Sequence, residues 1–186
     1  KKKAAEILKN SGDFTNILGV MSLLSGEYQD AIKYFEETIK NSLKDRSDAL
    51  SNLAYIYLLA GKKEEAKLLL HESAKHNPAS PVPFIGLGYL NWSADDFDEA
   101  LAQFNQAISI APNNFFAYYS RGQMYFAQRK IDLARNGFLY CLDNNSSFHP
   151  TLYYLGLIAF MEKRYPDALN YFSLYIKQIE SPNSND

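Results

Sequence analysis

One small residue recurs along the whole chain at almost constant spacing. Alanine stands at Ala31, Ala66, Ala100, Ala134 and Ala168, at intervals of 35, 34, 34 and 34 residues. A fixed period of this length marks a repeated supersecondary unit, and one such unit is too small to bury its own apolar face. Neighbouring units must therefore stack on one another and share a continuous core.

Two further positions keep the same period. Four residues after each alanine stands a large apolar residue, and twelve residues before it stands a small one. The large residues are Phe35, Leu70, Phe104, Phe138 and Phe172, and the small ones are Gly19, Ala54, Gly88, Gly122 and Gly156. The apolar residues of each unit follow i, i+3, i+4, i+7 spacing, which predicts two helices per unit. The small residues let the paired helix axes approach closely, and the large residue fills the space beside that contact.

This pattern resembles the tetratricopeptide repeat family, in which Trp-x2-Leu-Gly-x2-Tyr, then Ala-x3-Phe, then Pro recurs every 34 residues. The best match is Phe84, Leu87, Gly88, Phe97, Ala100, Phe104, Ala107 and Pro112. The resemblance implies an all-α fold, an α-solenoid formed as a right-handed superhelix of antiparallel helix hairpins. We expect one array of five repeats over residues 12–182, with repeats at 12–46, 47–80, 81–114, 115–148 and 149–182. Residues 1–11 are interpreted as the remnant of a preceding repeat helix, and residues 183–186 as a polar tail.

The turn between the two helices of a repeat departs from the family pattern in three places. Gly26 and Gly61 match the family's turn glycine in the first two repeats. Asp95 replaces that glycine in the third repeat, and Arg129 and Lys163 depart from the pattern in the fourth and fifth.

Charge and hydropathy exclude several classes of function. The chain has 19 Lys and Arg residues against 21 Asp and Glu residues, a net charge of −2. It therefore lacks the basic excess that neutralises phosphates, and we expect no nucleic-acid partner. The apolar stretch at residues 152–161 is about half the ~20 residues that a membrane helix needs, so we expect no direct membrane insertion.

The reactive residues form no pattern for catalysis, a metal or a cofactor. Cys141 is the only cysteine, which excludes an intrachain disulfide and the cysteine-based zinc sites. His71 and His76 are five residues apart, whereas a helical zinc motif needs histidines at i and i+4. We therefore expect no enzyme activity, no metal and no cofactor.

Four positions of each first helix, the second, fifth, ninth and twelfth of the repeat, lie opposite the stripe that packs on the partner helix. The resemblance implies that these positions line a concave groove. The residues predicted for it are mostly aromatic: Tyr55, Ile85, Tyr89, Trp92, Phe116, Tyr119, Gln123, Phe126, Tyr153, Leu157 and Phe160. Aromatic residues are enriched at interfaces, so we predict that this groove binds an apolar or amphipathic segment of a partner protein. The alternative for any one of these residues is packing against the adjacent repeat.

Two functions remain open at this point. The first is a scaffold or adaptor that holds a protein or peptide segment in the groove. The alternative is a structural assembly protein that forms homo-oligomers through the array ends, because the last helix carries Tyr171, Tyr175, Ile176 and Ile179 with no repeat after it. The compartment is not specified by the sequence, and a soluble, cytoplasmic protein is weakly favoured. The chain begins without Met, so we interpret it as a fragment or processed form that leaves room upstream for a targeting segment.

Overall fold

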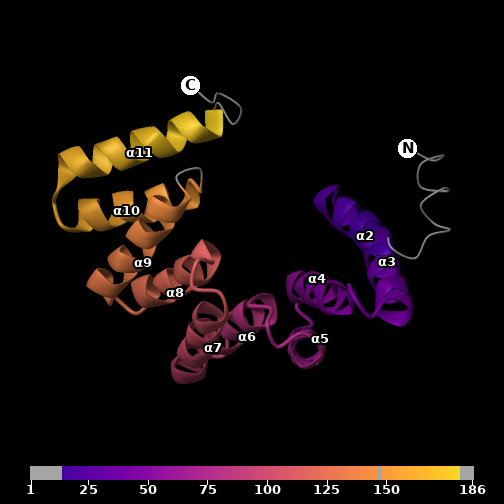
Figure 1. The fold of residues 1–186 in the computed structure, drawn as a ribbon. Helices are drawn as coiled ribbons and strands as arrows, with labels where there is room; N and C mark the ends of the chain where they lie inside the picture. The colour runs from indigo at the N-terminus through magenta and orange to yellow at the C-terminus, as the bar shows by residue number, and fades with distance from the viewer. Residues whose placement is uncertain (1–13, 146–147, 181–186) are drawn as a thin grey trace. The chain divides into compact units, whose positions relative to one another are not determined.

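The structure, a computed structural model, describes residues 14–145 and 148–180. Over these residues it contains helices and no strands (Figure 1), which confirms the predicted all-α class. The helices are α2 (Thr15–Leu24), α3 (Tyr28–Asn41), α4 (Arg46–Leu59), α5 (Lys63–His76), α6 (Val82–Trp92), α7 (Phe97–Ile110), α8 (Phe115–Ala127), α9 (Ile131–Asn144), α10 (Pro150–Met161) and α11 (Tyr165–Glu180).

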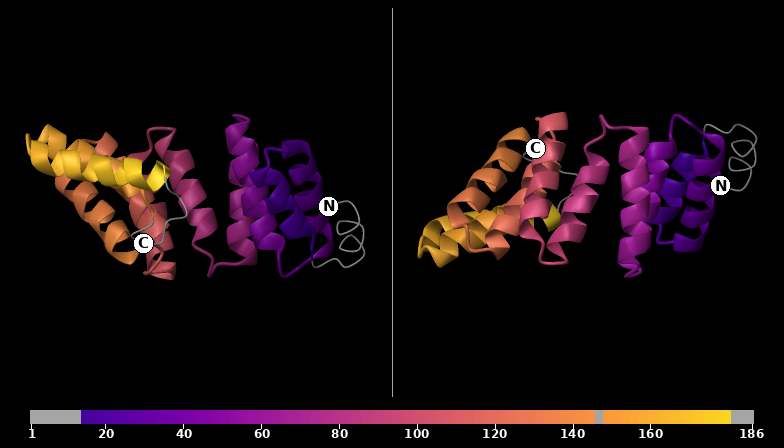
Figure 2. Two further views of the ribbon diagram at one scale, coloured as in Figure 1. Left: turned by 90° about the horizontal axis from the view of Figure 1, so that it is seen from above. Right: turned by 90° about the horizontal axis from the view of Figure 1, so that it is seen from below.

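The chain divides into two compact units, residues 1–103 and residues 104–186, and the division falls inside α7. Within the first unit α2 packs on α3, α3 on α4, α4 on α5 and α5 on α6. Within the second unit α8 packs on α9, α9 on α10 and α10 on α11. Figure 2 shows short turns between successive helices of each unit. Each unit is therefore a stack of helical hairpins, as predicted for an α-solenoid.

The helix bounds can be compared with the predicted repeats. Each predicted range holds one pair of consecutive helices, except that α4 begins at Arg46, one residue before its range. The predicted helix remnant at residues 1–11 and the predicted tail at residues 183–186 lie outside the described residues.

The predicted contact between the small and the large residue of a hairpin is confirmed. A Cβ atom added to Gly19 would lie 2.5 Å from Cε1 of Phe35, and one added to Gly156 would lie 2.5 Å from Cε1 of Phe172. Carbon atoms at van der Waals contact are ~3.5–4 Å apart, so only glycine leaves room for these rings. The repeat alanines are all buried, which confirms their packing role.

The turn inside each hairpin keeps one backbone conformation although its residue changes. The φ angle is 76° at Gly26 and 75° at Gly61, and it is 60° at Asp95 and 61° at both Arg129 and Lys163. A left-handed conformation costs a residue with a side chain about 1–2 kcal/mol. Three repeats therefore carry a different residue at this turn but keep the same backbone conformation. The packed helices on both sides of the turn fix that conformation.

Proline residues and acidic residues mark several helix ends. Helix α5 ends two residues before Pro78 and α7 ends two residues before Pro112, since proline cannot donate the next helical hydrogen bond. The second helices carry carboxylates in their first turns, such as Asp30 in α3 and Asp132 in α9, where the positive end of the helix dipole favours them.

Candidate functional site

The first unit carries four of the residues predicted for the groove, one on α4 and three on α6. Tyr55 on α4 is about half exposed, whereas Ile85 on α6 is 6% exposed and contributes packing rather than surface. Tyr89 and Trp92 are partly buried, and their rings stack with centroids 5.9 Å apart at 25°. We refer to Tyr55, Tyr89 and Trp92 as the α4/α6 face.

In the second unit, the predicted residues of α8 form the base of an aromatic layer. Phe116 is exposed, and its ring stacks on Tyr119 with centroids 6.0 Å apart. Tyr119 is 9% exposed and belongs to the hydrophobic core with Phe138 and Leu155. Like Ile85, Tyr119 therefore supports the surface from beneath.

A hydrogen-bonded amide connects α8 to α10. Nε2 of Gln123 donates to the hydroxyl oxygen of Tyr119 at 3.1 Å and to that of Tyr154 at 2.9 Å. The Tyr154 ring also packs edge-on against Phe126, with centroids 5.4 Å apart, and against Tyr153, at 5.6 Å. The side chains of the two helices are thus joined into one layer by rings and by an amide that donates to two partly buried hydroxyl groups.

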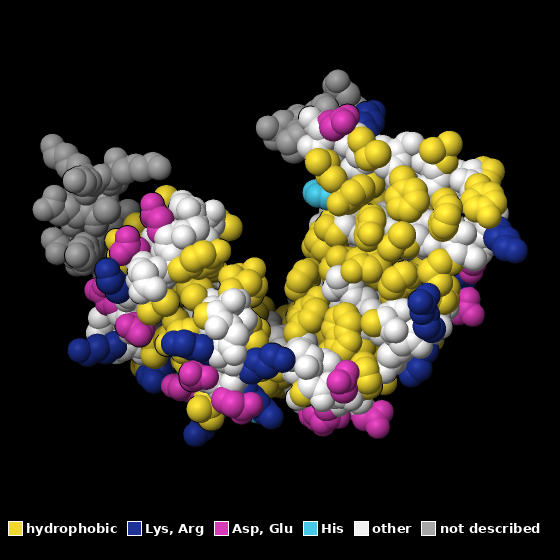
Figure 3. Space-filling model, turned by 180° about the vertical axis from the view of Figure 1, so that it is seen from behind, with side chains coloured by type: hydrophobic (Ala, Val, Ile, Leu, Met, Phe, Trp, Pro, Cys, Tyr) yellow, Lys and Arg dark blue, Asp and Glu magenta, His cyan; other side chains and the backbone are white. Residues whose placement is uncertain are grey.

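Helix α10 provides the exposed part of this layer. Tyr153 and Phe160 are exposed and Leu157 is partly buried, and the spacing of four and three residues places them on one side of the helix. Phe160 also packs against Tyr165, with ring centroids 5.7 Å apart. We refer to Phe116, Gln123, Phe126, Tyr153, Leu157 and Phe160 as the α8/α10 face. None of these side chains is charged, and Figure 3 shows hydrophobic side chains gathered over the second unit with charged ones at its margin.

Two aromatic residues of this layer were missed by the sequence analysis. Phe148 lies in the connection before α10, and its ring contacts Phe115, Phe116 and Tyr119 with centroids 4.9–6.2 Å apart. Tyr154 lies next to Tyr153 but was not assigned to the groove. The high aromatic content of residues 115–154 could have indicated both residues, but the prediction considered only the second, fifth, ninth and twelfth positions of each repeat.

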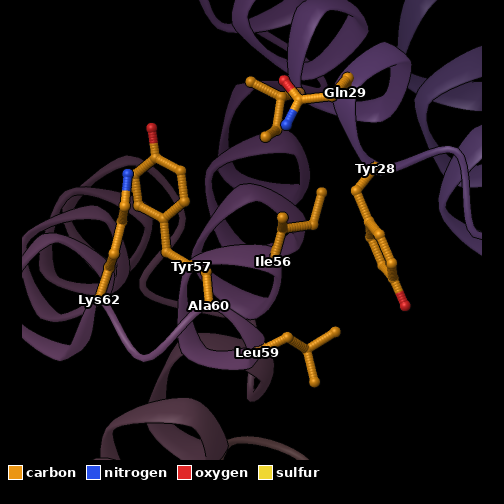
Figure 4. A pocket seen from close by; sticks show the side chains of 8 residues that line it. Tyr28, Gln29, Ile56, Tyr57, Leu59, Ala60 and Lys62 are labelled. Carbon is orange, nitrogen blue, oxygen red and sulfur yellow. The ribbon is translucent and has the colours of Figure 1, made fainter.

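A separate hollow of about 620 Å³ opens in the first unit, between the start of α3 and the end of α4 (Figure 4). It is lined by Tyr28, Gln29, Ile32, Ile56, Tyr57, Leu59, Ala60 and Lys62. The Nζ atom of Lys62 lies 5.3 Å from the centre of the Tyr57 ring, a distance at which the ammonium is attracted to the ring face. No residue predicted for the groove lines this hollow.

Two findings concern the metal-binding and nucleophilic side chains of the described residues. Among them, no group of three or more His, Cys, Asp or Glu side chains is arranged to hold a metal ion. The Cys141 thiol is buried, with Sγ 3.1 Å from the carbonyl oxygen of Phe115 and 3.0 Å from that of Gly137. Burial raises the pKa of this thiol to about 12, so it stays protonated at neutral pH and is a poor nucleophile. In the same described residues, no helix combines the length and the apolar character needed to cross a membrane.

Comparisons with known proteins point to one family. One family model, described as a TPR repeat, matches residues 88–128, and another, described as the tetratricopeptide repeat, matches residues 23–81. The TPR repeat-containing protein MJ1428 of Methanocaldococcus jannaschii is 26% identical over 147 residues, which are 79% of this chain and 26% of that protein. The photosystem I assembly protein Ycf3 of a Synechococcus species is 30% identical over 113 residues, 52% of this chain and 65% of that protein.

A solved structure agrees with the fold. The crystal structure of TTC0263, a thermophilic TPR protein of Thermus thermophilus, superposes with a TM-score of 0.78 and 19% sequence identity. The match covers 94% of this chain and 93% of the other. At this level of identity, the likeness concerns the fold alone.

Proposed function

The chain belongs to the tetratricopeptide repeat family, and we propose that it is a non-catalytic scaffold or adaptor that holds an apolar or amphipathic segment of a partner protein. Proteins with this repeat generally bind other proteins, and one relative is named for the assembly of photosystem I. What the proposal adds for this chain is the face that binds and the chemistry of the bound segment.

The α8/α10 face is the observation that carries the proposal. Two of its exposed rings, Phe116 and Tyr153, pack on buried or partly buried rings of Tyr119 and Tyr154, and the third, Phe160, packs against Tyr165. Contacts among aromatic rings contribute about 0.5–1.5 kcal/mol each beyond the area they bury, so this layer holds its exposed members in place. An apolar surface fixed in this way loses little side-chain entropy when a partner binds.

The same face indicates the kind of segment that it binds. It carries no charged side chain, so it offers nothing to compensate a buried carboxylate or ammonium of the partner. A helix with apolar anchors at i, i+3, i+4 and i+7 suits such a surface, and the hydroxyl group of the exposed Tyr153 suits the polar side of that helix. The α4/α6 face is a second surface of the same aromatic type.

Peptide selection tests this proposal directly. A displayed library of peptides of about 16 residues, which span ~24 Å as a helix, is selected on the purified chain. The recovered sequences are expected to be apolar or amphipathic. We expect the double variant Tyr153→Ala, Phe160→Ala to weaken their binding at least about 30-fold, which corresponds to the loss of one hot-spot contact of about 2 kcal/mol. The parallel variant Tyr89→Ala, Trp92→Ala measures the contribution of the α4/α6 face.

A matched control comes from the same unit. Leu133 on α9 is about half exposed and is absent from the α8/α10 face, so Leu133→Ala removes exposed apolar surface without changing that face. Binding should be unaffected by this change, and circular dichroism should show equal helicity for all variants. Equal affinity of the selected peptides for wild type and for both double variants would exclude both faces as the binding site.

A further inference from the structure

The hollow between α3 and α4 lies at an internal junction of the first unit. Helix α2 precedes α3 in the stack and α5 follows α4, and a solenoid repeat contacts only its neighbours. A further hairpin stacked on α2 or on α11 would therefore leave the hollow open. Its volume of about 620 Å³ is within the usual range of about 300–1,000 Å³ for ligand sites.

The hollow combines apolar walls with one cation. Ile56 is 4% exposed and lines it from the side of the core, whereas Tyr28 and Leu59 are about half exposed. Lys62 is the one charged residue among those that line it. Figure 4 shows Lys62 and Tyr57 together on one side of the hollow and Tyr28 on the other. The Lys62 ammonium therefore lies at the edge of an apolar surface.

An ion-pair network fills the corresponding junction of the second unit. Arg135 stands one residue after its repeat alanine, the position that Ile32 has in the first hairpin. The guanidinium of Arg135 pairs with Glu162, and that of Arg164 pairs with the same carboxylate at 3.3 Å. Beside these side chains the hollow measures only about 80 Å³.

The first unit keeps the outer cation of this network and lacks its carboxylate. Lys62 stands eight residues after the small residue of its hairpin, as Arg164 does. Ala60 stands six residues after that small residue, where the last hairpin has Glu162. Glu65 is near in the sequence, but among the described residues no ion pair within 4.0 Å includes Lys62. A cation therefore borders a space from which the carboxylate of the other junction is missing.

We propose that this hollow binds a segment of a partner protein in which a large apolar residue lies beside a glutamate or an aspartate. The apolar side chain occupies the hollow against Ile32 and Ile56. The carboxylate pairs with the Lys62 ammonium, in the place that Glu162 takes in the second unit. A protein segment is the occupant because protein side chains fill the same space at the other junction.

This inference goes beyond the proposed function, because no residue of the α4/α6 or the α8/α10 face lines the hollow. Those two faces carry no charged side chain, so they suit apolar anchors alone. The hollow adds a requirement for a negative charge. A partner that carries both kinds of segment is held at two places, which raises its apparent affinity.

Counter-selection isolates the peptides that use this hollow. The double variant Ile32→Arg, Ala60→Glu rebuilds the ion pair of the second unit and fills the space, at one partly buried and one exposed position. A displayed library of short random peptides is first depleted on this variant and then selected on wild type. The depletion removes peptides that bind the α4/α6 or the α8/α10 face, because both faces are intact in the variant. The remaining peptides are expected to combine a large apolar residue with a neighbouring Asp or Glu.

The filled variant needs a check of its own. Circular dichroism should show the helicity of wild type. If the double variant loses helicity, Ala60→Glu alone takes its place, since it supplies a carboxylate to Lys62 from an exposed position.

Fluorescence anisotropy with the recovered peptides measures the contribution of the charge. Lys62→Gln should weaken their binding about three- to fivefold, the loss of one partly exposed ion pair. Replacing the acidic residue of the peptide by its amide should weaken binding equally, and both changes together should add little, since each removes the same ion pair. Raising NaCl from about 0.05 M to about 0.5 M should weaken binding to wild type and leave binding to Lys62→Gln nearly unchanged. The control is Lys67→Gln, at an exposed position on α5 that does not line the hollow, and it should bind like wild type.

Three outcomes would overturn the proposal. If no peptide remains after depletion, the hollow is not a peptide site, and binding of decanoate by wild type alone would then assign it to a small amphiphile. Recovered peptides that carry no acidic residue would exclude the pairing with Lys62. Equal affinity of wild type and Lys62→Gln would exclude it as well. Failure of the proposed function is a separate result, because it is measured on the peptides that the filled variant retains.

Discussion

Replacing Gly19 by alanine tests the close contact of the first hairpin. The new Cβ atom would lie 2.5 Å from Cε1 and 2.7 Å from Cδ1 of Phe35, far inside contact distance. Phe35 is fully buried, so its ring has no free space into which it could move. In the second hairpin the same two positions hold Ala54 and Leu70, which share one hydrophobic cluster. The chain thus combines glycine with phenylalanine in one hairpin and alanine with leucine in the next.

These two combinations predict that Gly19→Ala lowers the free energy of unfolding when residue 35 is phenylalanine and raises it when residue 35 is leucine. Alanine is favoured over glycine inside a helix by about 0.8–1 kcal/mol, whereas overfilling a core costs about 1–3 kcal/mol. In the wild-type background we therefore expect a net destabilisation of up to ~2 kcal/mol. In the background of Phe35→Leu the clash is removed, and Gly19→Ala should stabilise the protein by up to ~1 kcal/mol. The coupling between the two positions is then about 1–3 kcal/mol.

Urea unfolding followed by circular dichroism measures the four members of this cycle. Transition midpoints are compared at unchanged m-value, since a change in m would mean that the unfolding is no longer the same transition. Ala102→Gly, at an exposed position inside α7, serves as the reference for helix propensity alone and should cost about 1 kcal/mol. Equal effects of Gly19→Ala in both backgrounds would refute the argument, because they would mean that the Phe35 ring yields without cost.

Two further predictions concern the turns and the buried thiol. Arg129→Gly should stabilise the protein by about 0.5–1 kcal/mol, because relief of the left-handed backbone exceeds the added entropy of the unfolded chain. Gly61→Ala should destabilise the protein by about 1 kcal/mol, because it introduces a side chain at the same backbone conformation. Urea midpoints measure both effects, and destabilisation by Arg129→Gly would contradict the assigned strain. Cys141 should resist alkylation in the native state and react once unfolded, as measured by mass spectrometry, and fast native labelling would contradict its burial. Because its pKa is raised on folding to about 12, the stability from burying the neutral thiol is complete below the unfolded pKa of ~8.5 and is lost as the pH rises through 12.

The helical hairpins were predictable from the sequence because short-range constraints decide them. A glycine that faces a phenylalanine, as Gly156 faces Phe172, can be recognised from spacing alone. The turn at Lys163 was less predictable, because no local preference favours a left-handed lysine. There the packed helices on either side fix the backbone, and the residue accommodates the conformation it is given.

The exposure of the residues predicted for the groove was only partly predictable, because a helical projection considers one helix at a time. Tyr119 projects to the groove side of α8, yet it is buried because Phe148 and Tyr154 pack against its ring. Both neighbours follow it by about thirty residues or more, so their contact depends on how the hairpins stack. Ile85 likewise projects to the groove side of α6 but is only 6% exposed in the structure.

The junctions between hairpins also explain why family membership leaves the function open. In the first unit, Ile32 and Ala60 line the hollow of about 620 Å³. In the second unit, the equivalent positions hold Arg135 and Glu162, which form an ion pair beside a hollow of only about 80 Å³. Neither position belongs to the motif that defines the repeat. The residues that set the fold and the residues that shape each junction are therefore different sets, so the repeat motif leaves the surface at each junction free to differ.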